Sequence, residues 1–406
     1  MTSTHTILEY VWIDGNGEFR SKVKVIRHEA YKHKIIHGED IVNKPEYFWS
    51  FDGSSTNQAV TEKSDLLLIP VFVCENPLYA HGWGNMRNTS RVSQAFLVLC
   101  SVWIDPVTPH PTNTFVNMMK YFEHPKVVKE EPMFGLEQEY FIMKYNDKTN
   151  THWNVPIGWT AEAVSKRPLA PYGDIQGPYY CSVGSKNAFG REIVEEHMLK
   201  CMEAGLQICG TNAEVAPGQW EFQIGIANHL EAAHQLLVAR YILERVAEQH
   251  GCWINYHPKP LPGFNGSGCH TNFSTKKMRE EGGLKHIRNA IDKLAQKHQE
   301  HIAVYGKDNE MRLTGNCETA SIDTFSMGNC DRGSSIRIPI QVVKEQKGYF
   351  EDRRPAANMD PYLVCSKLIE TIIIGHTPSE LELEPETELE PELETEPVKK
   401  YQKKKK

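Results

Sequence analysis

Five glutamates and one histidine, spread over more than two hundred residues, together have the composition of a site for several metal ions. They are Glu137, Glu139, Glu214, Glu221, His270 and Glu351. Carboxylate ligands with a single imidazole suit Mg²⁺ or Mn²⁺ better than zinc or copper. Carboxylates that crowd together without cations repel one another and raise their own pKa values, so the set is electrostatically reasonable when divalent ions occupy it. The chemistry that this composition indicates is phosphoryl transfer.

The pattern around the first two glutamates predicts that their side chains point in the same direction. Residues 134–143 form an apolar, strand-like run, FGLEQEYFIM. Side chains at positions i and i+2 of a strand share a face, so Glu137 and Glu139 lie on one face while Leu136 and Tyr140 lie on the other. Carboxylates at this spacing are able to hold separate ions.

The same alternation predicts a functional face in two later strand-like runs, residues 268–274 and residues 349–354. On one face of the first run it places Gly268, His270, Asn272 and Ser274. On one face of the second run it places Tyr349, Glu351 and Arg353. The second set offers an aromatic ring for a base, a carboxylate for a metal ion and a guanidinium for an anion. Any of these glutamates taken alone is more often a solvated surface residue, but their joint occurrence in apolar, strand-like surroundings favours a site.

Arginines form a second group of candidates, which predicts an anionic substrate. They are Arg312, Arg332, Arg337, Arg353 and Arg354. Guanidinium groups bind carboxylate and phosphate oxygens with two hydrogen bonds, so several in one site suit a substrate that carries both groups. Arg332 and Arg337 lie among glycines and serines, which permit close approach of the backbone to an anion. Arg354 taken alone is equally well explained by a surface ion pair. The sequence has no GxxxxGKS or GxxxxGKT motif, so a nucleotide is not held by a P-loop.

Composition excludes several classes of function. The 406 residues carry a net charge of −7 with both signs mixed along the chain, which gives no electrostatic argument for a nucleic-acid partner. No N-terminal segment resembles a signal peptide, and no run approaches the roughly 18 to 20 apolar residues of a membrane span. The ten cysteines include no CxxC pair. We therefore expect a cytoplasmic protein that binds neither nucleic acid nor a membrane.

The elements that must position these residues change in character along the chain. Residues 1–105 have the pattern of strands and turns, beginning with a hairpin signature. Residues 106–377 alternate strands with amphipathic helices. We expect helices, each closed by a glycine, at residues 190–205, 230–250 and 284–305. A turn-rich segment, residues 144–176, is predicted to be a surface excursion.

The end of the chain differs in composition from the rest. Residues 378–406 carry glutamate at every even position from Glu380 to Glu396, and then a lysine-rich end. Such a tract buries too little apolar surface to offset its chain entropy, and its prolines interrupt helices and sheets. We predict a disordered tail that follows a small domain, residues 1–105, and a larger one, residues 106–377.

Taken together, these segments resemble glutamine synthetase of the eukaryotic-type class, from about Tyr10 to Ile374. The motifs, in chain order, are WSFDGSST, FGLEQEY, GPYYC, GTNAEV, QWEFQIG, HPKPLPGFNGSGCHTNFSTK, RLTG, DRGSSIRIP and GYFEDRRPAAN. The resemblance implies an α+β fold, in which a small N-terminal β-grasp domain precedes a larger α/β catalytic domain with a curved antiparallel sheet flanked by helices. It also implies a homo-oligomer, a double ring (decamer), with active sites between adjacent subunits.

The resemblance further implies a role for each matching residue. The ion nearest glutamate and ammonia would be bound by Glu139, Glu214 and Glu221. The ion beside the ATP phosphates would be bound by Glu137, His270 and Glu351, and a site would hold two or three Mg²⁺ or Mn²⁺ ions. The substrate glutamate would be bound by Asn265, Gly266, Arg312 and Arg353. ATP would contact Glu221, Asn272, Phe273, Ser274, Arg332, Arg337 and Tyr349.

Three further residues would act in the reaction that the resemblance implies. Arg332 would neutralise the phosphoryl group during its transfer, Asp52 would bind ammonium and take its proton, and Glu318 would close a flap over the site. The γ-carboxylate of L-glutamate would attack ATP to give γ-glutamyl phosphate. Ammonia would then displace phosphate, giving L-glutamine, ADP and phosphate.

The sequence departs from the family pattern at several positions. Met133 replaces an aromatic residue that stacks on adenine, Asn316 and Cys317 alter the flap, and Asp331 places a negative charge beside Arg332. These changes leave two alternatives open. One is a related ligase that joins glutamate to another amine, against which Asp52 argues. The other is a catalytically impaired structural or regulatory homologue, against which the complete set of metal ligands argues.

Overall fold

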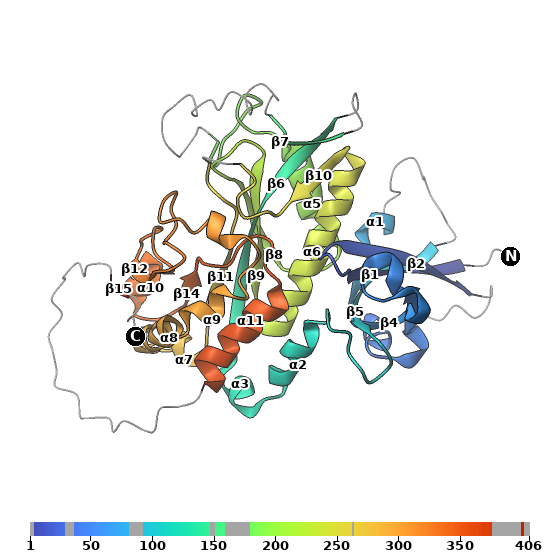
Figure 1. Cartoon of the computed structure of the whole chain (residues 1–406), viewed down its shortest axis with the longest axis horizontal. Coiled ribbons are helices and arrows are strands. Elements are labelled where there is room, and N and C mark those ends of the chain that lie inside the picture. The colour runs from blue at the N-terminus through green and yellow to red at the C-terminus, as the bar shows by residue number, and fades with distance from the viewer. Residues whose placement is uncertain are drawn as a thin grey trace.

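Two β-sheets, with helices between and around them, make up the computed structural model of this chain (Figure 1). The structure describes residues 4–28, 36–80, 92–146, 151–158, 179–261, 264–375 and 399–401. The smaller sheet has the strand order β2-β1-β5-β4-β3. The ten-stranded sheet has the order β15-β12-β13-β14-β11-β6-β9-β8, with β7 and β10 also paired to β6. This architecture confirms the predicted α+β class.

The smaller sheet is built from the first part of the chain and ends close to the predicted domain boundary. Its strands are β1 (Thr4–Ile13), β2 (Phe19–His28), β3 (Trp49–Asp52), β4 (Asp65–Glu75) and β5 (Val92–Trp103). β1 and β2 form the predicted hairpin, and the side chain of Asp14 holds the turn by accepting the N–H groups of Asn16 and Glu18. Leu8 and Tyr10 are fully buried in the core of this sheet. The helix α1 (Pro77–Ala80) follows β4.

The larger sheet has β6 at its centre. Its strands are β6 (Met133–Asn146), β7 (Thr151–Pro156), β8 (Ile208–Ala213), β9 (Gln219–Asn228), β10 (Cys252–Asn255), β11 (Cys269–Ser274), β12 (Phe325–Asn329), β13 (Ile336–Ile338), β14 (Phe350–Asp352) and β15 (Lys399–Tyr401). Among the described strands of this sheet, only β12 and β13 pair in parallel. As the alternation predicts, Leu136 and Tyr140 of β6 are buried in the main core.

Helices cover the larger sheet. They are α2 (Phe115–Phe122), α3 (Pro125–Glu130), α5 (Arg191–Glu203), α6 (His229–Gln249), α7 (Lys276–Arg279), α8 (Leu284–Gln296), α9 (His298–Ile302), α10 (Ile340–Glu345) and α11 (Pro361–Ile369). The predicted helices at 190–205 and 230–250 are confirmed as α5 and α6, and Gly205 and Gly251 after them have the positive φ angles expected of a helix end. Figure 1 shows α6 between the two sheets.

A buried carboxylate joins the smaller sheet to α6. Glu9 of β1 is 1% exposed and accepts hydrogen bonds from the Tyr241 hydroxyl at 2.6 Å and the Arg245 guanidinium at 2.7 Å. Its other oxygen accepts the Asn76 side-chain amide at 2.7 Å. Each oxygen of this buried charge therefore has a partner.

The helix predicted over residues 284–305 is divided into α8 and α9. Lys297 has φ −107° and ψ 16°, which lies outside helical values and interrupts the hydrogen-bond ladder. After this break, His298 hydrogen-bonds Arg354 at 3.0 Å, and His301 hydrogen-bonds Thr371 at 2.8 Å. These tertiary contacts override the local helical periodicity.

Two other segments only partly fall on described residues. Within the predicted surface excursion, residues 144–176, the strand β7 pairs with β6, and residues 147–150 and 159–178 lie outside the described chain. Within the predicted tail, residues 378–406, only residues 399–401 are described. They form β15 against β12, where we expected no regular structure. No helix in the described ranges is long and apolar enough to cross a bilayer.

Candidate functional site

Strand register brings the predicted ligands together on one face of the larger sheet. β6 pairs with β11 on one side, where Glu137 lies opposite His270. It pairs with β9 on the other side, where Glu139 lies opposite Glu221. On the far side of β11, β14 carries Glu351 opposite Asn272. Four strands that are distant in sequence therefore direct four glutamates and one histidine towards one region.

The six predicted ligands separate into two groups of three. Glu137, His270 and Glu351 form the first group, and Glu139, Glu214 and Glu221 form the second. Within each group the ligand atoms lie within 4.8 Å of one another. This division is the one that the resemblance implied. His270 also faces both groups, since its Nδ1 lies 3.5 Å from Glu137 and 3.9 Å from Glu139.

The second group carries more negative charge than its surroundings neutralise. Burial raises the pKa of Glu139 to about 7, against the opposing effect of Arg312. Burial, followed by repulsion from Glu139, raises the pKa of Glu214 to about 8. Burial, followed by repulsion from Glu137 and Glu139, raises the pKa of Glu221 to about 9. Buried carboxyl groups with raised pKa values are suited to binding divalent cations, because a bound cation favours their ionised form.

Amide side chains hold these carboxylates in place. Asn212 donates to Glu214 and Gln223 donates to Glu221, at 2.8 and 2.7 Å. Gln219 lies 3.5 Å from Glu139. We did not single out Asn212, Gln219 or Gln223 from the sequence. The sequence does contain a signal for Gln219 and Gln223, because residues 219, 221 and 223 of β9 lie on the same face of the strand.

Arginines surround the first group. Glu351 is fully buried, and its oxygens accept hydrogen bonds from Arg337 and from Arg353, the latter at 2.7 Å. Arg312 is buried, and its guanidinium lies 3.0 Å from Nε2 of His270. Arg353 also donates to the backbone carbonyl of Arg332 at 3.1 Å, which links the predicted phosphate-binding loop to this group.

Arg354 belongs to neither group. It is buried and pairs with Asp352 through two hydrogen bonds of 2.6 and 2.9 Å. Strand alternation explains this, because Glu351 and Arg353 face the site while Asp352 and Arg354 face the core. The pair is internal, so the surface ion pair that we considered for Arg354 is wrong.

A cavity of about 280 Å³ adjoins the first group and contains most of the predicted nucleotide contacts. Its lining includes Met133, Glu137, Asn272, Phe273, Ser274 and Tyr349. It also includes residues that the sequence analysis did not propose, namely Cys209, Gln223, Ile226 and Arg279. The exposed side chain of Ile226 lines this cavity, and it offers apolar surface to the flat ring of a ligand.

Phe273 lines this cavity, but strand alternation turns its ring towards the core. Its side chain is fully buried and packs against Phe134 and Phe350, with ring centroids 5.1 and 5.6 Å apart. Because alternation turns this ring to the core, contact with a nucleotide is left to its backbone.

The predicted glutamate-binding loop needs its glycines. A Cβ on Gly266 would lie 2.3 Å from the carbonyl oxygen of Pro258, and a Cβ on Gly268 would lie 2.5 Å from Nη2 of Arg312. Asn265 in this loop is 7% exposed, and its side-chain oxygen has no hydrogen-bond partner within the described ranges. A buried amide oxygen without a partner fits a substrate that donates a hydrogen bond.

The predicted flap lies beside the second group. Cys317 and Glu318 both have positive φ angles, 55° and 59°. The negative charge of Glu318 contributes to the raised pKa of Glu214, which places the two carboxyl groups near each other. Thr319 donates to the backbone carbonyl of Arg312 at 3.1 Å, so the flap is tied to the glutamate-binding residues.

The charge of Asp331 has a local structural use. Its carboxylate accepts hydrogen bonds from the Gly333 N–H at 2.8 Å and the Ser334 hydroxyl at 2.6 Å. These bonds shape the turn that carries Arg332, whose side chain is exposed.

Asp52 does not join the other predicted residues within this chain. It lies at the end of β3 in the smaller sheet, which Figure 1 shows on the opposite side of α6 from β11 and β14. Its carboxylate is exposed and accepts hydrogen bonds from the hydroxyl groups of Ser54 and Ser55. These bonds lower its pKa to about 2.

The chain is similar in sequence to known enzymes. It matches the family model described as glutamine synthetase, catalytic domain, over residues 111–404. It is 45% identical over 371 residues to the glutamine synthetase cytosolic isozyme 1-3 of Arabidopsis thaliana, which covers 91% of this chain and 95% of that protein. It is 48% identical over 371 residues to a putative glutamine synthetase of Acanthamoeba polyphaga mimivirus, again covering 91% of this chain and 95% of that protein. It is 45% identical over 377 residues to the nodule isozyme of Lupinus luteus, covering 92% of this chain and 96% of that protein.

Proposed function

This chain belongs to the glutamine synthetase family and is an ATP-dependent glutamate-ammonia ligase, and we propose that the two groups of acidic ligands form its catalytic centre. The observation that carries this proposal is the division of the ligands into two sets, each with its ligand atoms within 4.8 Å of one another. The raised pKa values of the buried glutamates add support, because burial and mutual repulsion disfavour their charged forms and a bound divalent ion would favour them.

We assign two or three Mg²⁺ or Mn²⁺ ions to this centre. When bound, such ions polarise phosphoryl oxygens and neutralise the charge of the transferring group. Glu137, His270 and Glu351 would hold the ion beside the ATP phosphates, and Glu139, Glu214 and Glu221 would hold the ion beside glutamate. Since Glu137 and Glu139 are two positions apart on one strand, β6 fixes the spacing of the two groups.

ATP would occupy the cavity beside the first group. Met133 and Tyr349 offer apolar surface for the base, and Asn272 and Ser274 offer hydrogen bonds. Arg337, which is bonded to Glu351, and the exposed Arg332 would bring positive charge to the phosphates. Arg337 lies on β13 and Arg332 lies in the turn that precedes this strand, so a short segment would orient the triphosphate.

The substrate glutamate would lie between the two groups and the loop that contains Asn265 and Gly266. Arg353 has a guanidinium at the edge of the first group and would bind a substrate carboxylate. Arg312 donates to His270 and to the backbone carbonyl of Arg353. We therefore assign Arg312 a positioning role in addition to its predicted role in substrate binding. The γ-carboxylate would then attack the γ-phosphate of ATP and give γ-glutamyl phosphate.

The second step requires neutral ammonia, so a carboxylate must first bind ammonium and then accept its proton, directly or through a neighbour. The low pKa of Asp52 keeps its carboxylate ionised and suited to binding this cation, and because so weak a base holds no proton near neutral pH, the proton would pass to a neighbouring group. Because Asp52 lies away from the ligands of its own chain, we propose that it enters the site of an adjacent subunit. The position of Asp52 supports active sites between subunits, and from the family resemblance we propose that the subunits form a double-ring homo-oligomer, a decamer.

Water must be kept from the acyl phosphate, and we assign this role to Glu318 and its loop. It lies near Glu214 on a loop that is tied to Arg312. Closure of this loop would shield the intermediate from hydrolysis.

The named relatives include a cytosolic isozyme, and we propose the cytoplasm for this chain as well.

Phosphate release from ATP and glutamate, with and without ammonium, tests this assignment. We expect release that depends on all three substrates and on Mg²⁺ or Mn²⁺. Glu351→Ala and Arg332→Ala should abolish glutamine formation while the circular dichroism spectrum stays unchanged, and the exposed residues Glu345 and Arg288, each changed to alanine, serve as matched controls. Retained turnover in either site variant would remove the assignment of that residue. Faster reaction with a short alkylamine than with ammonia would favour the alternative amine ligase.

A further inference from the structure

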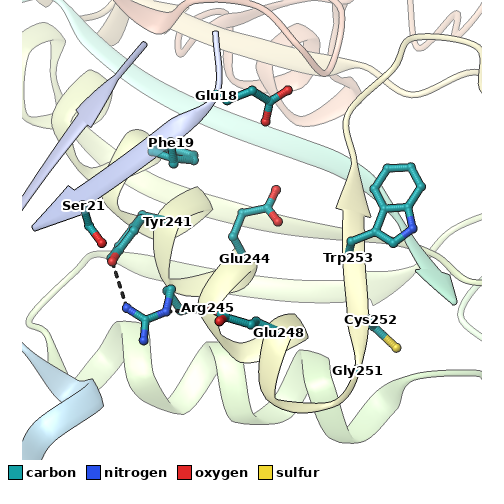
Figure 2. Close-up of a pocket in the computed structure, with 10 residues that line it drawn as sticks. All are labelled: Glu18, Phe19, Ser21, Tyr241, Glu244, Arg245, Glu248, Gly251, Cys252 and Trp253. Atoms are coloured by element: carbon teal, nitrogen blue, oxygen red, sulfur yellow. Dashed lines mark hydrogen bonds and ion pairs between the residues drawn. The ribbon is translucent and has the colours of Figure 1, made fainter. Parts of the chain in front are cut away.

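A second cavity, of about 480 Å³, lies outside the centre described above, between the hairpin of the smaller sheet and helix α6 (Figure 2). Its lining comes from β2 and the turn before it, from α6, and from β10 with the residue before it. Figure 2 shows the carboxylates of Glu18 and Glu244 extending into the space between β2 and β10. Phe19 and Trp253 lie on opposite sides of them in this view.

The cationic side chain described at this cavity already pairs with glutamates. Arg245 is the only cationic residue among the described residues that line it. Its guanidinium donates to Glu9 at 2.7 Å, to the Tyr241 hydroxyl at 3.0 Å and to Glu248 at 3.0 Å. Figure 2 shows it directed away from Glu244. Glu18 and Glu244 therefore face the cavity without a cation from its lining.

Glu244 sits in surroundings that disfavour its negative charge. Burial raises its pKa to about 8, and repulsion from Glu18 and Glu248 adds to this effect. A hydrogen bond from the backbone N–H of Ile254 opposes it. A cation placed between the carboxylates of Glu18 and Glu244 would remove the repulsion and favour the ionised form of Glu244.

We propose that this cavity binds a small organic ammonium ion, with its charged group between Glu18 and Glu244 and its carbon chain against Phe19 and Trp253. An ammonium group donates three hydrogen bonds, which carboxylates accept, and aromatic faces attract both the cation and its methylene groups. Bare Mg²⁺ or Ca²⁺ fits less well, because such ions require six or more oxygen ligands and much of this wall is aromatic carbon. An occupant of the cavity touches the smaller sheet and α6 together.

Binding of n-butylamine to the full-length chain, with n-butanol as a neutral control of the same shape, tests this proposal. Saturation-transfer NMR and isothermal titration are carried out without ATP, glutamate or ammonium. We expect the amine to bind and the alcohol not to bind. Glu244→Gln, which keeps an acceptor for Ile254, and Glu18→Gln should each weaken binding by about tenfold or more. Glu195→Gln on α5, which changes an exposed glutamate, should leave the affinity unchanged.

Two further variants locate the bound amine. Asp52→Asn removes the proposed ammonium ligand of the catalytic centre and should leave n-butylamine binding intact. If Glu244→Gln does not fold, Trp253→Leu supplies the test, because it removes an aromatic wall and should weaken binding of the amine. Equal affinity of wild type, Glu18→Gln and Glu244→Gln, equal binding of n-butanol, or loss of binding in Asp52→Asn would each overturn the proposal.

Discussion

Replacing Glu221 by glutamine should stabilise the chain in the absence of divalent ions while abolishing glutamine synthesis. The pKa of Glu221 is raised from its ordinary 4.5 to about 9, mainly by burial and then by Glu137 and Glu139. A carboxyl group of this kind keeps its proton in the folded state and loses it on unfolding, so stability falls as pH rises from about 4.5 towards about 9. Glutamine removes this penalty and still accepts the hydrogen bond from Gln223.

The size of the effect follows from the same shift. At pH 7.5 the penalty is at most about 4 kcal/mol, and about 2 kcal/mol once the repulsion is shared among neighbouring carboxylates. Divalent ions act in the opposite direction, since they bind the folded wild type and stabilise it by about 2.7 kcal/mol at a hundredfold excess over Kd. The variant should gain in stability without ions and lose the part of the response to Mg²⁺ that comes from the second group.

Urea unfolding at pH 6 and pH 8, with EDTA or with MgCl₂, measures both effects at one fixed protein concentration. Wild type should lose stability between the two pH values in EDTA and recover it in Mg²⁺, whereas Glu221→Gln, which keeps Glu139 and Glu214, should show a smaller loss and a smaller recovery. Glu62→Gln, an exposed glutamate away from the ligands, is the matched control. If Glu221→Gln is less stable than wild type in EDTA at pH 8, the raised pKa of Glu221 does not destabilise the fold and the reasoning fails.

Three further changes follow from contacts in the structure. Gly268→Ala would place a Cβ 2.5 Å from Nη2 of Arg312, so we expect kcat/KM for glutamate to fall about a hundredfold with the spectrum of the fold retained. Phe273→Leu should lower the free energy of unfolding by about 1 to 2 kcal/mol and leave the KM for ATP within about twofold, and a larger change in KM would mean that the ring itself contacts the nucleotide. Glu9→Ala should cost about 3 to 5 kcal/mol in urea unfolding because Arg245 loses a buried partner, whereas Glu9→Gln, which keeps an acceptor, should cost less.

Period-two alternation was sufficient to predict the faces of the candidates on β6, β11 and β14. It separated Glu137 and Glu139 from the buried Leu136, and it also separated Glu351 and Arg353 from their neighbours in the core. The pairing of Glu137 with His270 is different in kind, because it depends on the register between strands more than a hundred residues apart. Local patterns carry no information on that register, and the two groups of ligands came from the family resemblance.

The residues that sequence reasoning missed are chemically inconspicuous. Gln219 and Gln223 share a face with Glu221, yet an amide in a strand does not attract notice until its carboxylate partner is known. The break at Lys297 was missed for a related reason, because the contacts of His298 and His301 that follow it lie far away in sequence.

The two ligand groups differ in how they are neutralised, and this difference has a consequence for ion binding. Glu351 in the first group accepts hydrogen bonds from two arginines, whereas the second group has carboxyl pKa values of about 7, 8 and 9. An ion that enters the second group must displace protons at neutral pH, so its affinity rises as pH increases through that range. Charge in the first group is partly balanced by fixed guanidinium groups, so its affinity depends less on pH. A rise in pH should therefore increase the affinity for the ion beside glutamate more than the affinity for the ion beside ATP. Proton release on titration with Mg²⁺ should come mainly from the second group.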